Sequence, residues 1–233
     1  MVINRKAFLL IVAFLIVVSL LGVWFLNTAK SIDAGVHSRV FSVVIDAGHG
    51  GIDGGAEGTN TSVKESDLNL EIARHLKSKF QDIGVNVIMT RNSYGGLYGT
   101  TAKGFKKRDL EKRVKIINNS NADVLVSIHL NCYSSPKRRG ATVFFGEGKQ
   151  EGERLAKSVQ KHFNTLSAQP KDYSATRGDY YLLNQSKIPA VICECGFLSS
   201  PEDEKLLLTE AYQKEIAEKI FYGVIEYLSL QGE

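Results

Sequence analysis

The chain has 233 residues, of which 43% are hydrophobic and 23% are charged, and its formal net charge at pH 7 is +4. This length and balance fit one well-packed globular domain and exclude a disordered or low-complexity protein. The three cysteines, Cys132, Cys193 and Cys195, are too few and too unevenly placed for a disulfide framework.

The first element is an unbroken apolar segment, Ala7–Leu26, that follows Arg5 and Lys6. A helix of this length spans the ~30 Å hydrocarbon core of a bilayer. A cleavable signal peptide has a shorter apolar core and a small-residue cleavage site, which the following "NTAKSIDAG" does not match well. We therefore expect residues 1–26 to form an uncleaved signal anchor, a transmembrane helix, with a cleaved signal as the alternative.

The location of the rest of the chain follows from this anchor. Because flanking positive charges stay inside, everything after Leu26 should lie outside the cytoplasmic membrane. An exported location and the lack of aromatic residues interleaved with the basic clusters argue against nucleic acid as a partner. Residues 27–40 should form a short polar linker, and residues 41–230 one folded domain.

Strands and helices alternate along this domain. The patterns predict strands over residues 40–46, 85–90, 123–130, 141–145, 180–183 and 189–197. They predict helices over residues 66–80, 110–120, 152–166, 202–208 and 211–228, with Ser66 as the N-cap of the first. Continuous apolar strands separated by amphipathic helices are typical of an α/β fold, with a mostly parallel, twisted sheet of about six strands and helices on both faces.

A glycine-rich loop follows the first strand, in the sequence "VVIDAGHGGIDGGAEG" of residues 43–58. Each glycine loses much conformational entropy on folding, so a cluster of them needs a geometric reason. A phosphate-binding loop is excluded, because the segment lacks the Lys-Ser/Thr pair of a P-loop and does not open straight into a helix. The alternative is a loop whose backbone passes close to a metal and its substrate.

Three metal-binding side chains occur where strands of such a sheet end or a helix begins. His49 lies in the loop after the first strand, His129 closes a buried strand, and Glu65 begins the first amphipathic helix. Two imidazoles and a carboxylate are the ligand set of a catalytic zinc site. By itself, His129 could be a core histidine and Glu65 a helix-start acid, with Glu57 or Glu71 serving instead.

The chain contains five words, in this order: "DAGHGG", "KESDLNL", "MTR", "SIHLN" and "PAVICECGFLSSPEDEKLL". Together they resemble the zinc-dependent Amidase_3 family of N-acetylmuramoyl-L-alanine amidases, over nearly all of residues 41–229. The resemblance implies Zn²⁺ bound by His49, Glu65 and His129, with Glu194 as the catalytic carboxylate. The implied reaction hydrolyses the amide between the lactyl group of N-acetylmuramic acid and L-alanine, so the partners are the glycan strand and stem peptide of peptidoglycan.

Glu194 also stands out from the residues alone, because an acid inside the apolar run "AVICECGF" is costly to bury without a function. Cys193 and Cys195 beside it depart from the family, which more often has small or apolar residues there. Both should share one strand face, point away from the site and pack as small hydrophobes. Arg91 of "MTR" could bind a carboxylate of the stem peptide or pair with a neighbouring acid.

The predicted anchor, the absence of a cell-wall-binding repeat and the insertion "YGTTAKGFKKRDLEKRV" further resemble the family's spore-cortex amidases. This implies action on the forespore cortex through muramic-lactam formation, a role in germination, and control by an accessory envelope lipoprotein or other regulator. The competing functions are a zinc-dependent deacetylase of the same glycan and a non-catalytic envelope module.

Two basic runs lie in this domain, at residues 103–115 and 136–140. Most runs of this kind are solvated faces of a fold. The second interpretation is attraction to an anionic polymer at the cell surface.

Overall fold

The computed structural model describes residues 4–5, 9, 12, 14–24 and 41–230. The chain divides into two compact units, Met1–Arg39 and Val40–Glu233. Residues 14–24 are helical, and within the described residues no helix is both long and apolar enough to cross a membrane. The other residues of the predicted anchor, and the whole predicted linker at 27–40, lie outside the described residues.

The second unit is built on a six-stranded sheet in the order β2-β1-β3-β6-β4-β5. Its strands are β1 (Ser42–Ala47), β2 (Asn86–Met89), β3 (Val124–Asn131), β4 (Thr142–Phe145), β5 (Thr176–Arg177) and β6 (Ala190–Phe197). All neighbouring strands are parallel except β4 and β6, which pair antiparallel. The prediction of a mostly parallel sheet is confirmed.

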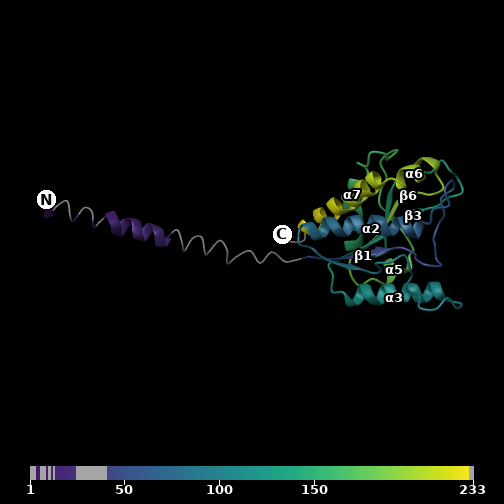
Figure 1. The fold of residues 1–233 in the computed structure, drawn as a ribbon, viewed down its shortest axis with the longest axis horizontal. Coiled ribbons are helices and arrows are strands. Elements are labelled where there is room, and N and C mark those ends of the chain that lie inside the picture. The colour runs from purple at the N-terminus through teal and green to yellow at the C-terminus, as the bar shows by residue number, and fades with distance from the viewer. Residues whose placement is uncertain (1–3, 6–8, 10–11, 13, 25–40, 231–233) are drawn as a thin grey trace. The chain divides into compact units, whose positions relative to one another are not determined.

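Helices cover both faces of the sheet, as predicted. They are α2 (Glu65–Asp82), α3 (Phe105–Asn119), α4 (Gln150–Phe163), α5 (Tyr181–Gln185), α6 (Pro201–Leu207) and α7 (Glu210–Ser229). The larger core cluster joins α2, α4 and α7 to one face, and a smaller cluster joins α3 and α5 to the other. Figure 1 shows α3 and α5 on the side of the sheet opposite α2 and α7.

The alternation of side chains along β6 separates structural from functional residues. Cys193 and Cys195 are both fully buried in the larger core cluster, where they pack as small hydrophobes. Because successive strand residues point to opposite faces, Glu194 between them faces the α3 and α5 side together with Ile192 of the smaller cluster. The prediction that both cysteines point away from the site is confirmed.

The predicted strand at residues 180–183 is wrong, because this segment enters helix α5, and the edge strand is β5 instead. In the run "YYLL" the two tyrosines favour a strand, whereas the two leucines favour a helix. In a strand, Leu182 and Leu183 would point to opposite sides, yet both are buried, at 4% and 1% exposure. A helical turn lets both leucines pack into the same smaller cluster.

The predicted N-cap of α2 is also wrong. The helix begins one residue earlier, at Glu65, with Lys64 at the N-cap position, and Ser66 lies inside the first turn. The Ser66 carbonyl accepts a hydrogen bond from Arg91 at 2.7 Å. The apolar face of the helix is as expected, since Leu68 and Ile72 are buried with the next two turns of the same stripe.

Candidate metal centre and active site

Two imidazoles and a carboxylate converge at the carboxyl ends of β1 and β3. His49 follows β1, His129 lies in β3, and Glu65 is the first residue of α2. One donor atom from each of the three lies within 4.8 Å of the others, so the group could hold a metal ion. The two imidazole rings are 4.9 Å apart and nearly perpendicular. The structure thus brings together the three residues that the sequence singled out.

Glu65 is the buried centre of this group, with 3% of its surface exposed. Its Oε1 lies 2.9 Å from Nδ1 of His129 and 3.3 Å from Nε2 of His49, and its Oε2 accepts the Ala56 amide at 2.8 Å. Burial raises the pKa of Glu65, but the hydrogen bonds and charges of His129 and His49 outweigh it and hold this pKa well below its usual range. The carboxylate is therefore anionic at neutral pH and attracts a cation.

The two other acids considered from the sequence lie elsewhere. The Glu71 carboxylate pairs with Arg74 at 2.7 Å and accepts the Tyr94 hydroxyl. The backbone of Glu57 forms an isolated antiparallel β-bridge with Lys64, and its side chain is exposed. Of these acids, Glu65 is the one in contact with both imidazoles.

Asp53 orients the His49 ring by contacting Nδ1, the nitrogen that faces away from Glu65. Nδ1 of His49 lies 2.9 Å from Oδ2 of Asp53, whose Oδ1 pairs with Nζ of Lys106 at 2.9 Å. Burial lowers the pKa of His49, but its contacts with Asp53 and Glu65 outweigh burial and raise this pKa to about 9. A carboxylate on the far nitrogen of an imidazole is typical of metal-binding histidines. The surroundings therefore favour positive charge at this cluster, which fits a divalent cation with three protein ligands and an open position.

Two glycines of the loop lie so close to the ligand side chains that no other residue would fit there. A Cβ at Gly48 would overlap the imidazole of His129, and one at Gly55 would overlap the carboxylate of Glu65. Gly55 also has a φ of +71°, and His49 itself has a φ of 61°. The loop can approach the ligand cluster this closely only because these positions lack a side chain.

Glu194 lies beside this cluster without joining it. On neighbouring strands, β3 and β6 place His129 and Glu194 directly opposite each other. Glu194 is 7% exposed, and among the described residues its Oε2 has no hydrogen-bond partner. Burial raises the pKa of Glu194 to about 7, with opposing charge from His129 and added repulsion from Glu65. A buried, unpaired carboxyl that titrates near neutrality can exchange protons with a ligand.

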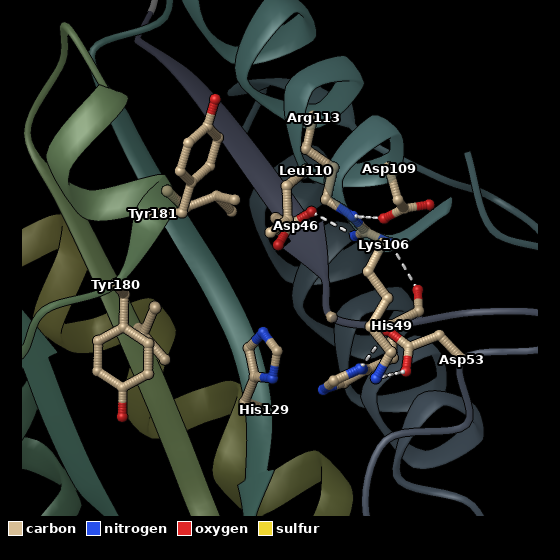
Figure 2. A pocket seen from close by; sticks show the side chains of 13 residues that line it. Asp46, His49, Asp53, Lys106, Asp109, Leu110, Arg113, His129, Tyr180 and Tyr181 are labelled. Carbon is tan, nitrogen blue, oxygen red and sulfur yellow. Dashed lines mark hydrogen bonds and ion pairs between the residues drawn. The ribbon is translucent and has the colours of Figure 1, made fainter. Parts of the chain in front are cut away.

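A cavity of about 230 Å³ opens next to the two histidines. Figure 2 shows Tyr180 and Tyr181 on one side of it, and Lys106, Asp53 and His49 on the other. The two tyrosines stand at the start of α5, and Lys106 belongs to α3. The cluster is therefore reachable from a recess between these two helices.

Arg113 is a positioning residue that the sequence did not reveal. It lies in a basic run expected to be solvated, yet it is 2% exposed. Its guanidinium pairs with Asp46 at 2.7 Å and Asp109 at 2.5 Å, and donates to the His49 carbonyl at 2.5 Å. Arg113 thus ties α3 to the loop that carries His49. The signal was its place on the apolar face of α3, one turn before the buried Ile117.

Asp46, near the end of β1, belongs to a buried polar network beneath the loop that carries His49. Its carboxylate accepts the hydroxyls of Thr90 at 2.6 Å and Ser127 at 2.7 Å, besides the ion pair with Arg113. Burial raises the pKa of Asp46, but the Arg113 charge and these hydrogen bonds outweigh it and lower this pKa to about 2. Asp53 is the acid that contacts His49.

Among the described residues Arg91 forms no ion pair with an acid, and its burial leaves it little access to a cleft, so the structure favours neither role that the sequence suggested. It is 3% exposed, and its guanidinium donates to the carbonyls of Ala47, Gly48 and Ser66 at 2.7–2.9 Å. Buried backbone carbonyls need donors, and a planar guanidinium supplies several at once. Arg91 fastens the end of β1 to the start of α2.

Comparison with known proteins agrees with this fold and site. Residues 43–226 match the Amidase_3 family, described as N-acetylmuramoyl-L-alanine amidase. The chain belongs to this family and is therefore an amidase that acts on peptidoglycan.

Individual relatives are similar across most of the chain. The germination-specific N-acetylmuramoyl-L-alanine amidase of Bacillus subtilis is 37% identical over 195 residues, covering 82% of this chain and 81% of the relative. The CwlD amidase of Clostridioides difficile, solved in complex with the GerS lipoprotein, is 38% identical with a TM-score of 0.78, covering 82% of this chain and 99% of that one. N-acetylmuramoyl-L-alanine amidase AmiA of Escherichia coli is 30% identical over 229 residues, covering 79% of this chain and 75% of the relative.

Proposed function

We propose that the protein hydrolyses, with zinc, the amide between the lactyl group of N-acetylmuramic acid and L-alanine. The observation that carries this proposal is that a cluster of metal donors lies next to a buried carboxyl, with His129 of the cluster and Glu194 on adjacent strands. His49, Glu65 and His129 offer three donors within 4.8 Å. Glu194 lies opposite His129, and its Oε2 has no hydrogen-bond partner among the described residues. Amide hydrolysis needs both an electrophilic centre and a proton carrier.

The donor set suits zinc, which binds imidazole nitrogen and carboxylate oxygen and keeps a position open in catalytic sites. When bound, zinc supplies Lewis-acid polarisation of the scissile carbonyl and a lowered pKa for water. Asp53 holds His49 in orientation through Nδ1, and the Leu130 amide donates to Glu65 at 3.1 Å. These contacts hold the ligands in place before metal binds.

Glu194 does the proton transfers in this proposal. In its ionised form the carboxylate accepts a proton from the attacking water as the carbonyl carbon is attacked. The same carboxyl then donates that proton to the departing nitrogen of L-alanine, which leaves as an amine. A pKa near 7 suits both steps, because the group then gains and loses a proton readily at neutral pH.

Product analysis tests this proposal. The purified full chain is incubated with peptidoglycan, with zinc and with a chelator, and the products are identified by mass spectrometry. We expect zinc-dependent release of stem peptides that begin with L-alanine, leaving intact N-acetylated glycan. Release of acetate instead would identify a deacetylase, and no zinc-dependent product would leave the fold as a non-catalytic module.

The biological setting that we propose is the spore cortex. A germination-specific amidase of Bacillus subtilis and the CwlD amidase are among the similar proteins, each aligned over 82% of this chain. Removal of the stem peptide frees the lactyl carboxyl, which can form a muramic lactam with the amino group of the same sugar once a separate deacetylation has removed its acetyl group. The enzyme would thus act in cortex maturation and thereby in germination. Deletion of the gene should yield spores whose cortex lacks muramic lactam, and normal lactam would contradict this setting.

We also propose that residues 1–26 anchor the chain in the membrane with the catalytic domain outside the cytoplasm, where peptidoglycan lies. The support is the uncharged apolar run after Arg5 and Lys6. The mature protein should keep its original N-terminus and fractionate with membranes, whereas an N-terminus near residues 28–36 would show a cleaved signal. Since CwlD was solved with the GerS lipoprotein, we propose an accessory lipoprotein here as well.

A further inference from the structure

A second, larger cavity lies on the same side of the sheet as Glu194. It measures about 680 Å³. Its floor includes Thr142 and Phe144 of β4, and its walls come from the basic run at 136–140 and the segment around residues 170–176. The wall residues are Asn131, Lys137, Arg138, Arg139, Pro170, Lys171, Tyr173, Thr176 and Phe197.

The lining of this cavity is strongly cationic. Lys137, Arg138, Arg139 and Lys171 all line it, and none of the described residues in the lining is acidic. Arg139 is partly committed to the fold, because its Nε pairs with Asp203 at 3.2 Å. Lys137, Arg138 and Lys171 are exposed. Like charges held around one hollow raise the local positive potential and favour an anionic ligand.

Two contacts place this cavity next to the reacting groups. Thr142, which lines it, is paired directly with Glu194 across β4 and β6. The ring of Phe144, also in its lining, contacts the ring of Tyr180 at 5.4 Å, and Tyr180 lines the smaller cavity beside His129. The two cavities therefore flank this aromatic pair.

We propose that the cationic cavity binds the carboxylates of the stem peptide and so sets the direction in which substrate lies across the active site. This proposal rests on the proposed function. The scissile amide joins a lactyl-bearing sugar to a peptide, and the peptide side carries free carboxylates whereas the N-acetylated sugars are uncharged. The charge of the cavity matches the peptide side. The role that the sequence considered for Arg91 thus falls to the basic run around Arg138 and to Lys171.

The decisive experiment compares two synthetic muramyl peptides that differ only in charge. One carries free carboxylates along the stem peptide, and in the other these are amidated. The zinc-loaded full chain is tested as wild type, as the triple variant K137Q/R138Q/K171Q, and as the control variant K112Q/K115Q/K187Q. The control removes the same charge from exposed lysines that line neither cavity.

We expect the triple variant to raise KM for the acidic peptide about tenfold with little change in kcat, because rim charges steer and hold a ligand rather than act in the transition state. KM for the amidated peptide should stay unchanged, the control should match wild type on both peptides, and the effect should shrink in high salt. Equal losses on both peptides, or no loss on either, would overturn the proposal.

Binding of the released peptide separates this proposal from the proposed function. Calorimetry measures the affinity of the free acidic stem peptide for wild type and for the triple variant, with no turnover required. Weaker binding by the triple variant supports the cavity assignment even if no amide is cleaved, and equal binding overturns it.

Phosphate polymers of the cell wall are anionic, as carboxylates are. A further experiment therefore distinguishes a phosphate polymer from the stem peptide as the ligand of the cavity. An oligomer of glycerol phosphate with matched charge is titrated as a competitor of the acidic peptide. Weak competition supports the stem peptide as ligand. Competition tighter than the peptide's own affinity, and lost in the triple variant, would assign the cavity to a phosphate polymer and overturn our proposal.

Discussion

The surroundings of Glu65 and Glu194 differ, although both are buried glutamates at one site. Oxygens of Glu65 accept from the amides of Ala56 and Leu130 and contact two imidazoles. Among the described residues, Oε2 of Glu194 has no partner. Burial raises the pKa of both carboxyls, but only Glu65 has donors that outweigh it, so its pKa is lowered whereas that of Glu194 rises to about 7.

This difference supports the roles that we propose for the two acids. A carboxylate held anionic by several donors suits permanent contact with a cation. A carboxyl near its point of half-protonation suits proton transfer. Environments that push the pKa values of two acids apart thereby separate a ligand from an acid-base group.

Removing the anionic partner should have the largest effect. Glu65→Gln keeps size but loses the charge between His49 and His129, and we expect more than a ~100-fold loss of zinc affinity, since even indirect partners of ligands are worth 10- to 100-fold. Activity should disappear with the metal, measured as zinc content and turnover. Glu71→Gln, on the same helix, is the control, and loss of zinc there with retention in Glu65→Gln would reverse our assignment.

Removing the proton carrier should cost less and leave the metal in place. Glu194→Gln cannot accept a proton, so kcat should fall by ~10²- to 10⁴-fold while KM changes little. Zinc content, measured in parallel, should match wild type, as should the exposed control Glu202→Gln. Loss of zinc in Glu194→Gln would make Glu194 a ligand and erase the contrast with Glu65.

The contrast can be sharpened without touching either acid. Gly48→Ala adds a Cβ that overlaps the His129 ring, whereas Gly95→Ala places its Cβ at an ordinary 3.5 Å from Ser93. We expect Gly48→Ala to lower zinc affinity by about 10- to 100-fold, as displaced ligand orientation does, and Gly95→Ala to have no effect. Competition with a chromophoric chelator measures both, and equal affinities would show that the imidazole has another position.

Asp46 is a third buried carboxylate, outside the ligand set. Its effect on the free energy of unfolding as pH falls should be the smallest of those predicted here. Its pKa of about 2 lies below the unfolded value of about 4, so its ionised form stabilises the fold above pH 4, and that stability is lost as pH falls through 2. The loss should be about 2 kcal/mol. Urea unfolding of the full chain from pH 6 to pH 1.5 measures it, and Asp46→Asn should flatten this dependence whereas exposed Asp172→Asn should not.

The sequence predicted those parts of the fold that depend on periodic patterns. The apolar stripe of α2 and the alternation of β6 around Glu194 appear in the structure as expected, because burial follows directly from period 3.6 or 2. The loop glycines predicted close backbone approach for the same kind of local reason. His49, Glu65 and His129 could be chosen because few other residues offer metal donors at the ends of strands.

The sequence could not reveal features that depend on distant partners. The sequence predicts a strand where the structure has helix α5, since its tyrosines favour strands and the leucines that favour a helix are too few to decide without tertiary packing. Arg113 and Arg91 looked like surface or ligand-binding arginines, yet their donors meet buried carboxylates and carbonyls brought from other segments. A one-dimensional charge pattern does not show which arginine will find such partners.

The antiparallel pairing of β4 with β6 has a consequence for how such enzymes can diversify. Because β4 starts beside Glu194, the chain leaving β3 needs only the segment 132–141 to reach it, and that segment stays at the catalytic edge of the sheet. The segment can lengthen, shorten or change charge without altering a strand register or a ligand of the cluster. Substrate preference and hydrolytic chemistry are thus carried by separable pieces of chain, and one can be exchanged while the other is kept.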